Sequence, residues 1–115
     1  MNVKIDLNLT KVILFGTDSF PKKDPEEKNY SESAYIKTAT FLIESQLING
    51  QTGTNDRGKV LAVELYSLTE TGKLFLSEIQ NYKKRKLLEK KLSTFGDKLT
   101  PETLVAIIKN EIKKA

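Results

Sequence analysis

Clusters of basic side chains are the residues of this chain best suited to bind a partner. Residues 82–91, YKKRKLLEKK, carry six positive charges and one negative charge. That density favours a polyanionic partner, such as duplex nucleic acid or an anionic membrane surface. A solvated helix face is the alternative, because lysine-rich surfaces are common. The imbalance belongs to the second half of the sequence: residues 51–115 hold 13 Lys and Arg against 8 Asp and Glu, whereas residues 1–50 hold 6 against 7.

A second basic group lies in a glycine-rich stretch earlier in the chain. Residues 49–60, NGQTGTNDRGKV, hold three Gly with Asn, Asp and Thr, a composition typical of a loop tip. Arg57 and Lys59 lie there, close to Thr54 and Asn55. An arginine on a glycine-flanked turn can enter a DNA minor groove, whose negative potential attracts it. The alternative is a charged loop that serves only solubility.

The absence of other residue types excludes most enzyme chemistry. The 115 residues include no Cys and no His, so disulfides, Cys/His zinc sites, thiol nucleophiles, Ser-His triads and imidazole bases are ruled out. Carboxylates and tyrosines remain, but no glycine-rich phosphate loop and no metal-spaced acid cluster occurs. We therefore expect no enzyme activity, no cofactor, no metal site and no small-molecule substrate.

Length and hydropathy indicate a single soluble domain over residues 1–115. The net charge is +4, and no apolar run exceeds the five residues 104–108, far short of the length needed to span a bilayer. The first ten residues, MNVKIDLNLT, lack the layout of a secretory signal. We expect a cytoplasmic protein without membrane contact.

An alternating pattern at the start predicts a β-strand with one buried face, within a β-rich start over residues 1–16. The alternating apolar residues are Val3, Ile5, Leu7 and Leu9. Residues 11–16, KVILFG, fit either a buried strand or the first turns of a helix that begins near Thr10. Residues 17–29 hold two Pro among polar residues and indicate a connection.

Two N-cap signals predict the principal core helix. Asp24-Pro25 is followed by two acids, and residues 29–32, NYSE, form a second signal of this kind. From one of these the helix continues to about Ile48. Its shared apolar face is Tyr35, Ile36, Ala39, Leu42, Ile43 and Leu47. Phe41 lies on the opposite side, where we expect it to pack in the core rather than mark a contact surface.

The second half predicts a β-hairpin followed by helices. Residues 59–68, KVLAVELYSL, are typical of a strand and pair with the preceding stretch around a tip at residues 54–58. Thr69 then caps a helix whose apolar face is Phe75, Leu76, Ile79 and Tyr82. That helix ends or changes partner near residues 83–86. The last helix covers residues 100–114 and is amphipathic.

This series of elements resembles the winged helix-turn-helix family, particularly MarR-like and PadR-like regulators. The resemblance rests on the pair Leu47-Ile48 at the end of a helix, on Asp56-Arg57 in the hairpin, and on residues 68–73, LTETGK, where the second hairpin strand enters the next helix. The resemblance covers roughly residues 31–80. These residues belong to the region 24–80, which holds the predicted helix, the hairpin and the helix that follows it. It implies an α+β winged helix-turn-helix fold with an N-terminal β-strand and a C-terminal amphipathic helix.

By this resemblance the protein binds double-stranded DNA as a homodimer, because paired modules meet paired half-sites. It would be a transcriptional regulator or an accessory factor in plasmid or phage DNA processing, such as conjugation or replication. The helix offers few charges, so we expect the hairpin to dominate binding. The expected DNA-binding residues are Ser33, Lys37, Thr38, Thr54, Asn55, Arg57, Lys59, Lys83, Lys84 and Arg85.

Two other functions fit the same sequence. A protein-interaction module would use Phe41 and the isoleucine-rich last helix as its contact surface. Attachment to a membrane surface through residues 82–91 has less support, because the apolar face there is small.

Overall fold

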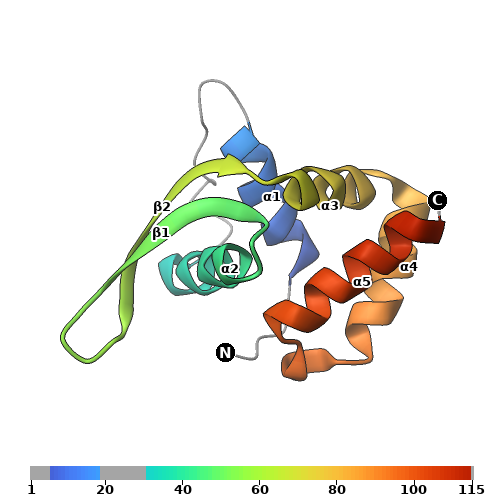
Figure 1. The fold of residues 1–115 in the computed structure, drawn as a ribbon. Helices are drawn as coiled ribbons and strands as arrows, with labels where there is room; N and C mark the ends of the chain where they lie inside the picture. Colours follow the sequence, from blue (N-terminus) through green and yellow to red (C-terminus); the bar gives the residue numbers. More distant parts are fainter. Residues whose placement is uncertain (1–5, 19–30, 115) are drawn as a thin grey trace.

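The computed structural model describes residues 6–18 and 31–114, which form an α+β fold with five α-helices and one two-stranded antiparallel hairpin (Figure 1). The elements in order are α1 (Leu7–Asp18), α2 (Glu32–Glu44), β1 (Ile48–Thr54), β2 (Val60–Leu68), α3 (Glu70–Gln80), α4 (Tyr82–Ser93), the short 3-10 helix η1 (Gly96–Lys98) and α5 (Pro101–Lys114). This arrangement is compatible with a winged helix. The predicted helix start at residue 24 lies outside the described residues, as do Val3 and Ile5.

The predicted N-terminal strand is wrong for the residues that the structure describes, because Leu7 and Leu9 belong to helix α1. Asp6 begins this helix: its Oδ1 accepts hydrogen bonds from the backbone N–H of Asn8 at 2.9 Å and of Leu9 at 3.2 Å. The buried side chains Leu7, Leu9, Thr10, Ile13, Leu14 and Thr17 recur at helical spacing. The helical alternative for residues 11–16 is therefore the correct one.

Helix α2 begins at the second of the two predicted signals and ends earlier than predicted. Ser31 is its N-cap and accepts a hydrogen bond from the N–H of Ala34 at 3.1 Å. The helix ends at Glu44 rather than near Ile48, because Gln46 takes the left-handed conformation, with φ of 59°. The N–H of Gln46 then bonds to Ile43 O and that of Leu47 to Leu42 O, both at 3.0 Å, which closes the helix as a Schellman motif. Leu47 and Ile48 consequently lead into β1.

The hairpin is confirmed; it passes alongside α2, and its tip projects beyond the helices (Figure 1). Its register runs from Ile48 opposite Leu68 at the base to Thr54 opposite Val60 near the tip. The base is buried, and the outer half is largely exposed. Only the base of the hairpin is therefore part of the buried core.

The junction between the hairpin and α3 is held by Thr69, which is confirmed as the N-cap of α3. Its Oγ1 accepts from the N–H of Gly72 at 3.0 Å and donates to Gln46 O at 2.7 Å. Its backbone N–H donates to Leu47 O at 3.1 Å. A Cβ on Gly72 would lie 2.0 Å from Leu47 O. Only glycine permits this approach of α3 to the turn that joins α2 to β1, which gives the Leu-Thr-x-x-Gly sequence a physical reason.

The core lies where α1, α2 and α3 meet the hairpin base, and α4 and α5 extend it. Phe41 is 2% exposed, so its predicted place in the core is confirmed. Phe75, Leu76 and Ile79 are buried as predicted, but Tyr82 begins α4 and is 71% exposed. The break after α3 comes at Asn81, slightly before residues 83–86. The last helix forms as predicted, with Leu104 and Ile108 fully buried.

We predict that Gly72→Ala destabilises the protein by about 2–4 kcal/mol, because the new methyl group meets a backbone carbonyl that cannot move alone. Urea unfolding followed by circular dichroism measures this. Gly53→Ala is the matched control, since a Cβ there meets nothing closer than 3.9 Å. Equal stability of the two variants would contradict the role given to Gly72.

Candidate nucleic-acid interface

The hairpin tip is shaped by Asn55. Its Oδ1 accepts from the backbone N–H groups of Arg57 and Lys59, both at 2.9 Å, and its own N–H donates to Lys59 O at 2.9 Å. Gly58 takes φ of 79°, a conformation that favours glycine. Asn55 therefore orders the turn and leaves the side chains of Arg57 and Lys59 exposed at the end of the hairpin.

A groove of about 410 Å³ separates the first turns of α2 from the start of β2. Its lining residues are Glu32, Ser33, Ile36, Lys37, Thr40, Gly58, Lys59, Val60 and Leu61. The fold thus brings Ser33 and Lys37 from the helix together with Lys59 from the hairpin, although more than 20 residues separate them in sequence. Thr38, half-buried on α2, and Thr54, exposed at the end of β1, do not line the groove.

Both polar and apolar groups line this groove. Lys37 and Lys59 supply two positive charges, and Glu32 supplies one negative charge. Thr40 is buried, and its hydroxyl has no hydrogen-bond partner among the residues that the structure describes. Sequence reasoning placed Ile36 on the core face of the helix, and it assigned no role to Thr40, Val60 or Leu61 in a site. In the structure, Leu61 stands out among these groove residues, because it is a large apolar residue and yet 54% exposed.

The middle of the hairpin carries a small polar network. Glu64 Oε2 accepts from Tyr66 Oη at 2.7 Å and from Gln51 Nε2 at 2.8 Å. These two bonds lower the pKa of Glu64, and the bond from Tyr66 to Glu64 raises the pKa of the tyrosine. The network joins β1 to β2 across one exposed face of the ribbon.

The basic residues of α4 lie far from the hairpin tip, at the opposite end of the molecule (Figure 1). Lys83 and Lys84 are exposed in the first turn, which is capped by Asn81 through a 3.1 Å bond from the N–H of Lys84 to Asn81 Oδ1. Lys86 stacks on Tyr82, with its Nζ 4.6 Å from the ring centroid. The structure therefore does not bring these lysines together with Lys37 and Arg57.

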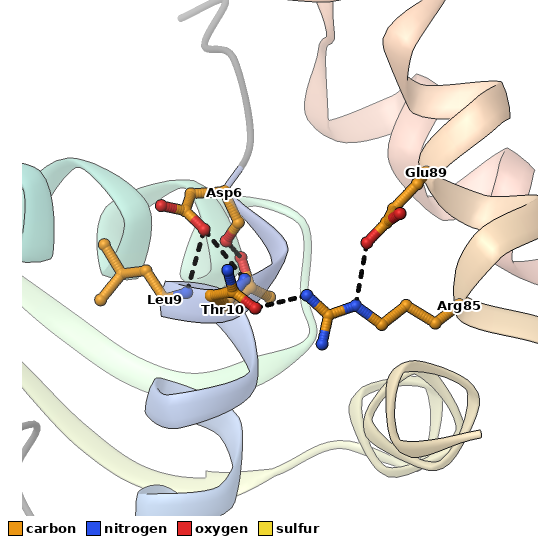
Figure 2. A network of polar contacts seen from close by, with 6 residues as sticks. Asp6, Leu9, Thr10, Arg85 and Glu89 are labelled. Carbon is orange, nitrogen blue, oxygen red and sulfur yellow. Dashed lines mark hydrogen bonds and ion pairs between the residues drawn. The ribbon is translucent and has the colours of Figure 1, made fainter. Parts of the chain in front are cut away.

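Arg85 is engaged within the protein. Its Nε donates to Glu89 Oε1 at 2.9 Å, and its Nη2 donates to Asn8 Oδ1 (Figure 2). Figure 2 shows the guanidinium group between α4 and the first turn of α1, beside the cap formed by Asp6. Arg85 thus braces α4 against α1, and its guanidinium group is less free to contact a partner than the exposed lysines beside it.

No family model, curated protein or solved structure matches this chain. Among the described residues, none of the helices combines the length and apolar character needed to cross a membrane. Within residues 6–18 and 31–114, no group of three or more His, Cys, Asp or Glu side chains could hold a metal ion.

We predict that Thr40→Val stabilises the protein by about 1 kcal/mol, because a buried hydroxyl without a partner costs about 1–3 kcal/mol. Urea unfolding measures the change. The matched control is Thr17→Val, which removes a buried hydroxyl that donates to Ile13 O at 2.7 Å. The control should bring no such gain. A loss of stability in Thr40→Val would show that its hydroxyl is satisfied.

The buried carboxylate of Glu78 predicts a pH dependence. Burial raises the pKa of Glu78 above its ordinary value of 4.5. The positive charges of Lys84 and Lys91 act in the opposite direction, but their effect on the pKa is smaller. The Oε2 atom of Glu78 accepts no hydrogen bond from the described residues. The folded state therefore holds this proton more tightly than the unfolded state, so stability falls as pH rises above about 4.5.

Glu78→Gln should consequently be more stable than the wild type at pH 7, and this gain should disappear near pH 4. Urea unfolding at the two pH values tests it, with the exposed Glu102→Gln as control. A wild type that is the more stable of the pair at pH 7 would contradict the burial argument.

Proposed function

We propose that this protein binds double-stranded DNA without catalysis, with the hairpin as a wing and α2 beside it. The observation that carries this proposal is the shared groove: Lys37 of α2 and Lys59 of the hairpin line it together. Arg57 extends beyond it at the exposed tip. A duplex laid along this surface meets cations from two separate elements.

The physical argument is electrostatic. Duplex DNA carries one negative charge per about 1.7 Å of axis, and neutralised phosphates supply much of the affinity. Lys37 and Lys59 reach phosphates, and the hydroxyls of Ser33 and Thr38 add hydrogen bonds that fix the register. Arg57 enters the minor groove, where the potential is most negative in narrow A·T-rich segments. Thr54 lies on the same part of the hairpin and contacts the backbone beside it.

The arrangement of charges makes the hairpin dominant. Helix α2 carries one lysine and two glutamates, so it contributes little net charge. Lys83 and Lys84 lie at the other end of a molecule whose longest dimension is 43 Å. They contact a separate stretch of DNA or a second surface, and they do not act on the base pairs that Arg57 reaches.

The small size of this module is consistent with one of two roles. A transcriptional regulator, or an accessory factor that marks a plasmid or phage site for DNA processing, would use it as a homodimer on paired half-sites. The rival function, a protein-interaction module, depended on Phe41 and on the last helix. Phe41, Leu104 and Ile108 are buried in the core, so those residues form no contact surface.

We predict that Arg57→Ala weakens binding to a duplex about tenfold at low salt and makes the salt dependence shallower by about one unit of slope. Fluorescence anisotropy with a labelled duplex at about 50 mM and about 200 mM salt measures both quantities.

Lys98→Ala is the control, because Lys98 is an exposed cation on η1, outside the groove and the hairpin. It should change neither quantity. A wild type that shows no salt-dependent binding would remove the proposed function, whereas an unchanged Arg57→Ala would remove the hairpin tip from it.

A further inference from the structure

We propose that the groove between α2 and the hairpin is also a binding site for a small organic carboxylate with an aliphatic body. Its volume of about 410 Å³ falls in the range of about 300–1,000 Å³ typical of small-molecule sites. This inference goes beyond DNA binding and holds for the free protein in the absence of DNA.

The apolar part of the groove accepts the aliphatic body. Ile36 of α2 and the residues Val60 and Leu61 of β2 line it together. Leu61 is 54% exposed although it is a large aliphatic residue. A ligand that covers these side chains removes apolar surface from water, which is the main source of affinity in such sites.

The charges of the groove select an anion. Lys37 and Lys59 outnumber Glu32, so the lining carries a net positive charge. Glu32 and Ser33 belong to the first turn of α2, where the helix dipole adds to the positive potential. A single carboxylate bonded to the two ammonium groups and to the Ser33 hydroxyl satisfies this pattern, whereas a cation or an uncharged molecule does not.

Thr40 supplies an independent observation that points to a ligand. Its side chain lines the groove and is 5% exposed, and its hydroxyl makes no hydrogen bond within the described residues. Buried hydroxyls nearly always have a partner, so one without a partner requires an explanation. Threonine in a helix has two accessible χ1 states, and the proposal requires that one of them lets the hydroxyl donate to a carboxylate in the groove.

Titration of the isotope-labelled protein with octanoate, followed by amide NMR shifts, tests the proposal. We expect saturable shifts at residues 32–40 and 58–61. Two probes separate the contributions: 1-octanol has the aliphatic body without the charge, and inorganic phosphate has charge without the body. Each should bind at least about tenfold more weakly than octanoate.

Two variants and a control complete the test. Lys37→Gln and Thr40→Val should each weaken octanoate binding about tenfold, and Lys109→Gln, on the exposed face of α5, should leave it unchanged. Because Thr40→Val is expected to fold more stably than the wild type, unfolding cannot account for its loss of binding. Octanol binding as tightly as octanoate, shifts centred elsewhere on the molecule, or unaffected variants would each overturn the proposal.

Discussion

One close contact fixes the base of the hairpin: the first turn of α3 packs against residues 45–47, the turn that joins α2 to β1, through Thr69 and Gly72. Thr69 bonds to the carbonyl groups of Gln46 and Leu47, and Gly72 leaves room for the Leu47 carbonyl. Both ends of the hairpin meet at this point, since β1 begins directly after Leu47 and β2 ends directly before Thr69. The position of the hairpin relative to α2, and therefore the groove between them, depends on this contact.

Local chemistry made much of the fold predictable. Capping at Ser31 and Thr69, the glycine-rich hairpin and the start of α5 all depend on residues within a few positions of one another. The errors arose where local patterns were ambiguous. Leu7 and Leu9 fit a strand by their alternation, but they also fit the helical spacing that continues to Leu14, and burial against the other helices favoured the helix. The end of α2 at Glu44 carried no signal, because the left-handed residue that closes the helix is Gln46, and glutamine is unusual at that position.

The candidate site was predictable only where its residues are neighbours in the sequence. Composition identified the hairpin tip, since Arg57 and Gly58 lie together in the sequence. The groove could not be predicted, because Thr40 and Leu61 are distant in the sequence and line the same groove only once the hairpin lies beside α2. Charge density alone also could not reveal that Arg85 braces α4 against α1. The groove and the proposed DNA surface share Lys37 and Lys59, so the two proposals predict that an anion in the groove and a DNA duplex compete for the same charges.

The central claim is that α2 and the hairpin tip approach one duplex together. Amide NMR shifts of the isotope-labelled protein, measured as duplex DNA is added in dilute salt, test this most directly. The account predicts that residues 33–38 and 54–59 shift together, along a single titration curve, and that added salt reverses the change. Shifts confined to α4, or a spectrum that DNA leaves unchanged, would contradict it.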